Sequence, residues 1–534
     1  MKKLAFLTAL LLIVNVSFSN GLITNTNQSV QFIRMMSRNA SLGIDGVYYN
    51  PAGLIKLENG WHFSLNNQTI FQTRIIDSKF PLLNDGYYEG DVTIPLFPTA
   101  FAVYKKDKWA FSFGFGPNAG GGSAMYERGM PSFEIPISKL ASGYKQLAPL
   151  MAIYNAPGVV GETGYNAQLS LDGSSVYFGF QIGATYEISN MFSIFGGVRY
   201  MSANNTYLGA IKNIEFETSV GNMAATDYQV MTSPILVGTI QTLDETSEGM
   251  QQAIDAGLID PNSLVSDPQL LQILTLLGYP EATNQQAIGI MKGGSATLNT
   301  LNSSDVSDKE VDTKQTGAGF TPILGVNISP NENWNVGIRY EHKTYMTVEN
   351  NTTVDDLGLF PDGAESRADV PGILGIGVGY TDKKWEAQVS YNYYFDKYVD
   401  WGGNIRDISV WKDKDPSQIR AREIENNSFD IALGLQYNLT EKFSLSAGAM
   451  YQKAGVADSY NSDFSFAPDS YVALGGGIMW KITDQLTLDA GVSYITYKDA
   501  EVSYFDPDLN ANYTESYGKE SIGFAVGLSY SIFR

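Results

Sequence analysis

The chain contains no cysteine and only two histidines among its 534 residues. Neither a disulfide nor a thiolate metal site can therefore stabilise it. His62 and His342 fall on different predicted strands, and the alternation of side chains directs the first inward and the second outward. This separation argues against a Ser-His catalytic site and against a histidine-rich metal site. We therefore expect no enzymatic activity, no metal and no cofactor.

Long apolar runs are also missing after the amino terminus. None approaches the roughly 20 residues that an α-helix needs to cross a bilayer, so any membrane crossing must use strands. At the terminus, two lysines precede a short apolar run and then small residues, which predicts a secretory signal peptide over residues 1–19. Removing Lys2 and Lys3 from the 35 basic residues leaves 33 against 56 acidic residues, a net charge of −23. This charge argues against nucleic acid as a partner.

Glycine and aromatic residues are abundant, with 53 Gly, 32 Tyr, 27 Phe and 7 Trp. At the carboxyl terminus, large apolar residues at the even positions of 522–532 alternate with Gly, Ala and Ser at the odd positions. In a soluble β-sandwich the second face would meet water and carry charged side chains. A barrel wall instead turns its bulky residues to lipid and its small residues to a filled lumen. The alternation therefore indicates a membrane barrel.

About fourteen segments share this pattern, each near the length of a tilted membrane-spanning strand. They are 61–71, 96–104, 109–115, 176–186, 192–200, 320–328, 334–340, 374–380, 385–395, 429–438, 443–451, 472–480, 486–494 and 521–532. Tight turns such as "KKDK" (105–108) alternate with long connections, the longest being 118–174 and 203–316. This parity is typical of outer-membrane barrels, which have short periplasmic turns and long extracellular loops. Aromatic residues at the strand ends fit interfacial girdles or ordinary cross-strand packing.

Four further stretches are distinctive: "NPAG" (50–53), "FSFGFGP" (111–117), residues 317–343 and residues 468–497. Together they resemble one known family, the FadL/TodX (OMPP1) outer-membrane transporters of long-chain fatty acids and other hydrophobic compounds. The resemblance implies an all-β, fourteen-stranded antiparallel transmembrane barrel over residues 61–534, with short helices in its long extracellular loops. Residues 20–60 are then an amino-terminal hatch, or plug, inside the lumen. Asn50, Pro51 and Ala52 are its expected gating residues.

The same resemblance implies passive uptake across the bacterial outer membrane. Extracellular loops capture a hydrophobic molecule, a lumenal pocket receives it, the hatch moves, and the molecule leaves sideways through the wall. Two apolar loop segments are candidates for the capture groove, unless they only pack against neighbouring loops. The candidates are Leu140, Leu147, Leu270, Leu271, Ile273, Leu274 and Leu277, in helices expected over 137–154 and after Pro268.

A fatty acid would require a cation for its carboxylate. Strand parity turns Arg199 and Arg339 to the lumen, where each is a candidate partner or is paired with a lumenal acid such as Glu341 or Glu386.

For the lateral opening, Gly114, Gly116 and Pro117 predict a weakened strand, and Pro95 and Pro98 interrupt the strand before it. The alternative is that these residues only end their strands.

The substrate stays open between long-chain fatty acids, which we expect first, and aromatic hydrocarbons or other lipophiles. A general porin and a structural or adhesive barrel are alternative functions, although a porin would line its lumen with charged residues. We expect outer-membrane lipid and lipopolysaccharide as surroundings and a monomeric protein. The ending Phe533-Arg534 departs from the usual barrel pattern, because Phe533 falls on the opposite parity from Ile532.

Overall fold

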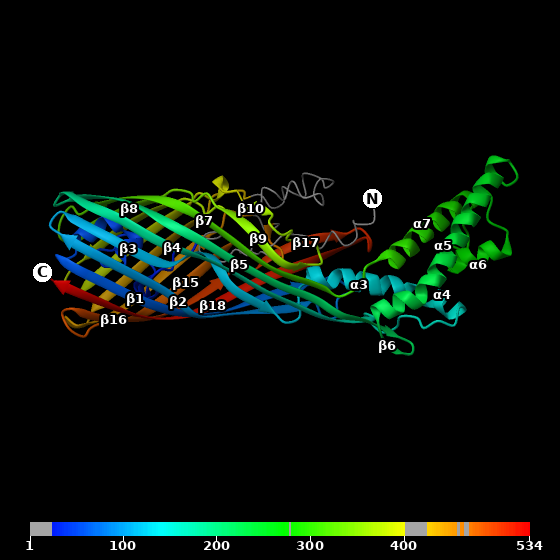
Figure 1. Cartoon of the computed structure of the whole chain (residues 1–534), viewed down its shortest axis with the longest axis horizontal. Helices are drawn as coiled ribbons and strands as arrows, with labels where there is room; N and C mark the ends of the chain where they lie inside the picture. The colour runs from blue at the N-terminus through cyan, green and yellow to red at the C-terminus, as the bar shows by residue number, and fades with distance from the viewer. Residues whose placement is uncertain (1–23, 277–278, 401–423, 457–459, 464–468, 534) are drawn as a thin grey trace.

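The computed structural model describes residues 24–276, 279–400, 424–456, 460–463 and 469–533, and a closed antiparallel β-barrel dominates it (Figure 1). Within these residues fourteen strands form the ring, which confirms the predicted fold class. β1 (Gly60–Ser78) closes the ring by pairing with β18 (Ala511–Phe533). The twelve strands between them are β2 (Tyr87–Lys106), β3 (Trp109–Tyr126), β4 (Tyr165–Ser189), β5 (Phe192–Thr218), β7 (Lys309–Ile328), β8 (Trp334–Glu341), β11 (Ile373–Thr381), β12 (Trp385–Tyr394), β13 (Phe429–Asn438), β14 (Phe443–Lys453), β15 (Ser470–Lys481) and β16 (Leu486–Tyr497). The expected signal peptide lies outside the described residues.

Several strands continue well past the predicted spanning segments. Residues 118–126, 165–174, 203–218 and 309–316, assigned from the sequence to long loops, are strand in β3, β4, β5 and β7. Four shorter strands extend the sheet on the same side: β6 (Gly221–Ala224), β9 (Thr347–Asp355), β10 (Glu365–Arg367) and β17 (Ala500–Asp506). Sequence alternation missed these extensions because the strands here leave the lipid, and their outward residues no longer have to be apolar.

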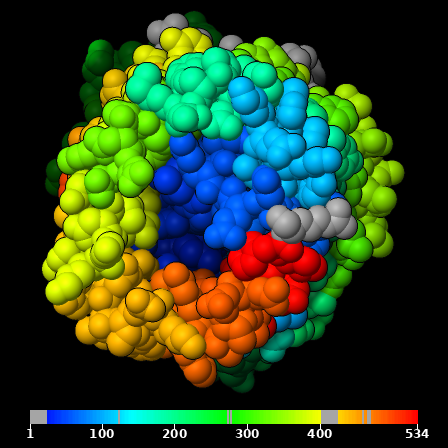
Figure 2. Space-filling view, turned by 90° about the vertical axis from the view of Figure 1, so that its left-hand side faces the viewer, coloured from blue at the N-terminus to red at the C-terminus, as the bar shows by residue number. Residues whose placement is uncertain are grey.

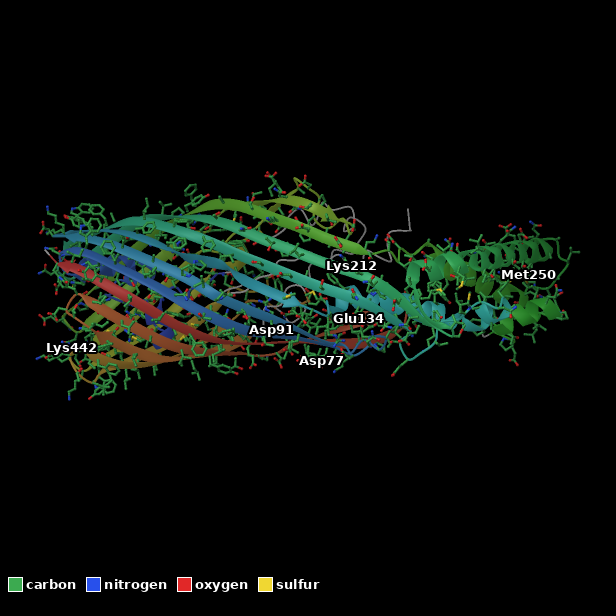
Figure 3. All side chains as sticks on the ribbon, turned by 60° about the horizontal axis from the view of Figure 1, so that its bottom comes forward. Asp77, Asp91, Glu134, Lys212, Met250 and Lys442 are labelled. Atoms are coloured by element: carbon green, nitrogen blue, oxygen red, sulfur yellow. The ribbon has the colours of Figure 1, made fainter. Side chains whose placement is uncertain are left out.

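The strand residues divide by face as the alternation predicts. Leu65, Phe320 and Leu324 point outward and are 64%, 64% and 61% exposed, whereas inward residues such as Ser64, Asn66 and Gln68 are buried. The short turns gather at one end of the barrel, where Lys442 is labelled in Figure 3. Near these turns the tryptophans pair across strands with tyrosines, including Trp109 with Tyr186 at 4.7 Å between ring centroids. Girdle position and cross-strand packing therefore coincide in the same residues.

One group of helices lies at and beyond the opposite end of the barrel (Figure 1). α3 (Pro131–Gln146) and α4 (Ala148–Ile153) follow β3, and α5 (Ala225–Asp255), α6 (Pro268–Leu276) and α7 (Asn284–Ser303) form a helical projection over residues 225–303. Met250 on α5 lies near its tip (Figure 3). The helices expected after Pro268 and over 137–154 are present, the latter as α3 and α4. The long helices α5 and α7 were not expected from the sequence. No helix of the described ranges is long and apolar enough to cross a membrane.

The amino-terminal residues 24–59, which we call the hatch segment, fold against the inner face of the barrel. Figure 2 shows them in blue inside the ring of strands. The segment contains α1 (Val30–Met35), α2 (Gly46–Tyr49) and the 3-10 helix η2 (Pro51–Lys56), and most of its residues are buried. Another short 3-10 helix, η3 (Asp396–Tyr398), follows β12. Lumenal glycines make room for the segment: a Cβ at Gly448 would lie 1.9 Å from the Met35 carbonyl oxygen.

Candidate functional site

Asn50 joins two parts of the hatch segment to the barrel wall. Its side-chain Nδ2 donates to the Ser41 carbonyl oxygen at 3.0 Å and to Oδ1 of Asn327, on β7, at 2.8 Å. A Cβ at Gly337 of β8 would lie 2.9 Å from Cγ of Asn50, so this glycine allows the amide to approach the wall. The local turn before the first strand is thus a point of attachment between hatch and wall.

Pro51 and Ala52 fasten the next residues to other strands. Pro51 occupies the first turn of η2, where its missing N–H costs no helical hydrogen bond. Its carbonyl oxygen accepts from Thr185 Oγ1 on β4 at 2.7 Å, and the Ala52 carbonyl oxygen accepts from Ser193 Oγ on β5 at 2.7 Å. Together, residues 50–52 are hydrogen-bonded to three successive strands of the ring.

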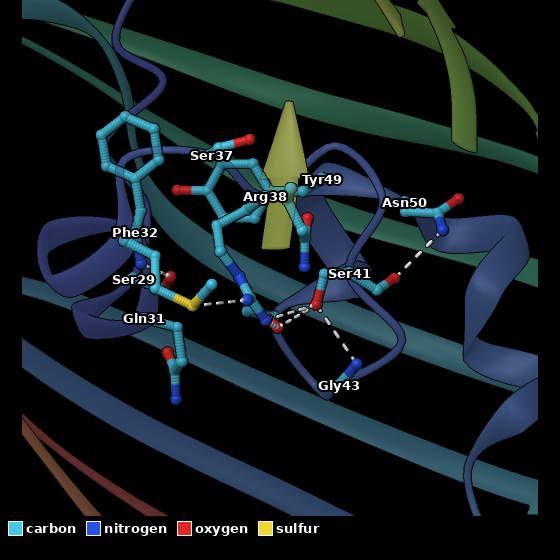
Figure 4. Close-up of polar contacts among 12 residues, drawn as sticks. Ser29, Gln31, Phe32, Ser37, Arg38, Ser41, Gly43, Tyr49 and Asn50 are labelled. Atoms are coloured by element: carbon cyan, nitrogen blue, oxygen red, sulfur yellow. Dashed lines mark hydrogen bonds and ion pairs between the residues drawn. The ribbon is translucent and has the colours of Figure 1, made fainter. Parts of the chain in front are cut away.

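Two buried arginines anchor the earlier part of the hatch segment. Arg34 Nε lies 2.9 Å from Oδ1 of Asp489, on β16. Arg38 Nε pairs with Asp45 at 2.6 Å, and its Nη1 reaches Glu386 of β12 at 3.0 Å. Figure 4 shows Arg38 beside Ser41, whose Oγ accepts from Arg38 Nη2 at 2.7 Å. Removing one partner of a buried ion pair typically costs about 3–5 kcal/mol, so residues 30–56 are held firmly.

Arg199 and Arg339, the candidate carboxylate partners, share one acid of the wall. Arg199 Nη1 and Nη2 donate to the two carboxylate oxygens of Glu341 at 2.6 and 3.0 Å, and Arg339 Nε lies 3.3 Å from the same group. Both guanidinium groups also stack on the ring of Tyr48, at 5.0 and 4.5 Å from its centroid. With exposures of 3% and 1%, both side chains are buried between the lumenal acid Glu341 and Tyr48 of the hatch segment.

The wall itself is interrupted between β2 and β3. The two strands pair from Lys106↔Trp109 to Ala100↔Phe115, and pairing resumes only at Asp91↔Met125. On the β2 side, Pro95 and Pro98 have no N–H to donate, and on the β3 side Pro117 and a glycine run follow Gly116. The pairing of β3 with β4 also shifts register after Pro117 and after Gly120. Gly114 still lies in the regular ladder, whereas Gly116 and Pro117 begin the interruption.

The first described residues of the chain cover this interruption. The Asn25 backbone N–H donates to the Asn118 carbonyl oxygen at 2.8 Å. The Pro117 carbonyl oxygen accepts from Asn25 Nδ2 at 3.0 Å and from Gln28 Nε2 at 2.6 Å. Thr24 and Ala119 form an antiparallel bridge. Carbonyl groups that β2 leaves unpaired are thus satisfied by residues 24–28, which we call the gate segment.

A groove of about 1820 Å³ lies among the helices beyond the barrel. Five helices, α3 to α7, or their ends contribute to its wall, which is mostly apolar, with several threonines and glycines. Its lining includes Leu147, Leu150, Ile153, Leu243, Leu271, Thr275, Gly289, Ile290, Gly293 and Leu298. The volume exceeds the roughly 300–1,000 Å³ of ordinary small-molecule pockets, so the groove has room for a flexible chain of carbon atoms.

The sequence-based candidates for this groove divide into three groups. Leu147 and Leu271 line it. Leu140 and Leu274 are buried in the apolar cluster beneath, and Leu270 packs against that cluster. The side chain of Ile273 and all of Leu277 lie outside the described residues. The α7 face containing Gly289 and Gly293 was not expected from the sequence, although "GIMKGGSA" (289–296) is its local signal.

One apolar cluster connects the groove with the interrupted wall. It contains the groove residues Leu150, Leu243 and Leu298, and it also contains Val92 of β2 and Ala124 of β3, which flank the interruption. A separate cavity of about 560 Å³ beside the cluster is polar, being lined by Glu127, Arg128, Glu134 and Lys212. An apolar molecule that moves from the groove to the wall would therefore keep contact with apolar side chains along the cluster, but not in the polar cavity.

A closed wall, an internal amino-terminal segment and a covered gap in that wall together define the class: an outer-membrane β-barrel of the transport type. A protein-family model described as outer membrane protein transport protein (OMPP1/FadL/TodX) matches residues 270–532. The chain belongs to this family, as its sequence motifs suggested, and its location is the outer membrane. The family's description is one of outer-membrane transport proteins.

Individual relatives are distant. Outer membrane protein P1 of Haemophilus influenzae is 25% identical over 236 residues, which are 42% of this chain and 50% of the relative. The chain thus spans about half the length of the curated relatives it matches. A crystal structure of a Pseudomonas aeruginosa FadL homologue shares the fold, with a TM-score of 0.54 at 11% identity, covering 96% of this chain and 99% of that chain. The Pseudomonas putida toluene transporter TodX gives a TM-score of 0.49 at 11% identity, over 92% and 95%.

Proposed function

We propose that this protein takes up hydrophobic molecules across the outer membrane without an energy source and releases them sideways into the membrane. The groove captures the molecule, the apolar cluster leads it to the barrel, and the gap between β2 and β3 is its exit. The observation that carries this proposal is the interrupted β2–β3 ladder covered by the gate segment.

The position of the gap suits delivery to lipid. Ala100 lies six positions before Lys106 at the tight turn, which places the lower edge of the gap about 15 Å above that turn for a tilted strand. Leu96 on the lipid side of the gap is 72% exposed. A molecule leaving here enters the hydrocarbon layer directly, and each Å² of its apolar surface kept from water contributes about 25 cal/mol.

The hatch segment divides into a fixed part and a part that is easier to release. Residues 30–56 hold the ion pairs of Arg34 and Arg38 and the contacts of Asn50. The gate segment, by contrast, contacts β3 through neutral hydrogen bonds, each worth only about 0.5–1.5 kcal/mol. We therefore assign the gating movement to residues 24–28, with Asn50, Pro51 and Ala52 holding the remaining hatch in place.

Uptake in cells with and without the protein tests the function. Labelled oleate and labelled toluene are supplied separately, which also compares a fatty acid with an aromatic hydrocarbon. We expect faster uptake of at least one of them when the protein is present. Equal uptake of both in the two strains would reject transport. Conductance in planar bilayers is the second measurement, because a large and stable open-channel current would indicate a general porin instead.

A further inference from the structure

The capture groove carries a specific charge pattern. Among its described lining residues the only charged side chain is that of Glu281, and no Lys, Arg or His contributes. The other polar lining groups, on Gln146, Tyr154, Tyr279 and Gln286 besides the threonines, are neutral. Over the whole helical projection, residues 225–303 contain eight Asp and Glu against the single Lys292, a net charge of −7. An anion approaching the groove therefore meets a negative field and finds no cation at the wall.

Four threonines of the groove present hydrogen-bond acceptors to it. Thr239, Thr242, Thr275 and Thr297 each donate their hydroxyl proton to the backbone carbonyl oxygen four residues earlier in the same helix, at 2.6–3.0 Å. With its proton used, a hydroxyl oxygen still accepts through its lone pairs. A carboxylate is an acceptor only and gains nothing from these oxygens, whereas an alcohol can donate to them.

Glycines keep the α7 side of the groove open. Apart from the adjacent residues and the backbone of the same helical turns, no atom lies within 4 Å of the position that a Cβ would take at Gly289 or at Gly293. The two residues are four apart and share one face of the helix. Glycine inside a helix is less stable than alanine by about 0.5–1 kcal/mol, so these positions are not explained by helix formation. They leave space that a ligand can fill.

We propose that the groove selects uncharged lipophiles with a hydroxyl head group over carboxylates of the same chain length. This inference rests on the proposed uptake function and names its substrate class. An ionised carboxylate loses hydration on leaving water, and the described residues of the groove wall offer it no cation in return. A neutral alcohol loses less hydration and recovers a hydrogen bond at a threonine oxygen.

Binding of a matched pair of probes tests the selectivity. Full-length protein in phosphatidylcholine nanodiscs is titrated with radiolabelled decan-1-ol and with radiolabelled decanoate, and empty nanodiscs give the lipid background. At about pH 7 we expect decanol to bind at least about tenfold more tightly. The difference should narrow at about pH 4, where a carboxyl group with a pKa near 4.3 is largely protonated. Equal binding at about pH 7, or tighter binding of decanoate, would overturn the inference.

A charge exchange at the groove wall makes the test specific to this site. Glu281→Lys should raise decanoate affinity about tenfold and change decanol affinity by much less, because decanol carries no charge. The matched control is Glu248→Lys, which makes the same change of charge on α5 at an exposed residue outside the groove lining. An equal rise in both variants would contradict selection by the groove wall.

Filling the groove identifies the site independently of charge. Gly293→Leu should abolish saturable decanol binding, while Gly249→Leu on α5 should not, because the latter position is also open but does not line the groove. Unchanged binding in Gly293→Leu would overturn the assignment. If cells expressing the unaltered protein take up neither decanol nor decanoate, the proposed function itself fails. If they take up both alike, the function stands and only the selectivity fails.

Discussion

A disulfide across the proposed gate should stop transport reversibly. The chain has no cysteine, so a double variant Thr24→Cys with Ala119→Cys introduces the only pair. These residues form an antiparallel bridge, in which Cα atoms lie about 4.5–5.5 Å apart, within the range that a disulfide requires. Thr24 and Ala119 are 2% and 3% exposed, and the Thr24 hydroxyl has no hydrogen-bond partner among the described residues, so its loss leaves no donor unsatisfied.

The size of the effect follows from the contacts that hold the gate. Release of the gate segment from β3 breaks three hydrogen bonds to Pro117 and Asn118, from the Asn25 N–H, Asn25 Nδ2 and Gln28 Nε2. Full release also breaks two hydrogen bonds with Gln68 of β1 and three with Tyr48 and Tyr49 of the hatch segment. At about 0.5–1.5 kcal/mol each, the three bonds to β3 alone favour closure by about 2–4 kcal/mol, so the open form is at most about one in thirty molecules. A disulfide removes that open population altogether.

The assay is uptake of the better transported probe in cells grown with oxidant and then treated with dithiothreitol. Oxidised cells should show the rate of cells lacking the protein, and reduction should restore the original rate. The control pair Ser503→Cys with Thr514→Cys joins opposite residues of β17 and β18, away from the gate, and should leave uptake unchanged. Full uptake with a quantitatively formed Thr24–Ala119 cross-link would refute exit between β2 and β3.

Three further predictions concern the hatch and the wall. Asn50→Ala removes two hydrogen bonds and leaves the buried Asn327 amide oxygen without this donor, which should destabilise the hatch by about 2 kcal/mol. The barrel should stay heat-modifiable on gels while the rate of uptake changes. Unchanged transport in both Asn50→Ala and Pro51→Ala would show that the motif has no part in the mechanism. Arg199→Ala should lower the free energy of unfolding by about 3 kcal/mol, because Glu341 loses its closest cation. Its effect on uptake should be the same for oleate and for toluene. A loss of uptake confined to oleate would instead identify Arg199 as the partner of a ligand carboxylate. Asp396 lies in the loop after β12, outside the spanning strand, and burial raises its pKa to about 6. The ionised form of this carboxyl is therefore disfavoured in the folded protein. Lowering the pH from about 7 to about 5 should increase the free energy of unfolding by about 1 kcal/mol. That pH-dependent part should vanish in Asp396→Asn, and an identical pH dependence of the unfolding midpoint in both proteins would contradict it.

The barrel could be predicted because one rule applies to every strand. Lipid on one side and a filled lumen on the other force bulky and small residues to alternate, as in residues 522–532, so the strands were recognisable one at a time. The same rule explains the failure at residues 203–218. Beyond the membrane the outward face meets water, the alternation fades, and a strand reads as a loop.

The candidate site could be predicted only in part. The prolines and glycines around Pro117 marked a weakened strand, since their effect on pairing is local. Nothing local, however, indicated that Asn25 and Gln28 would satisfy the carbonyl groups of that strand. For Arg199, parity established the lumenal face, but only the fold showed that Glu341 lies within 2.6 Å of it.

By itself the sequence determined the class of wall, the number of its strands and the family, because these follow from periodicity and from short motifs. Only the tertiary structure decided what covers the gap, which cations are paired, and that the end of α3, α4 and the helical projection line a groove whose described residues include acceptors and no cation. Those properties depend on contacts between residues up to hundreds of positions apart, such as Arg34 with Asp489, and no local pattern in a chain specifies its partner at that distance.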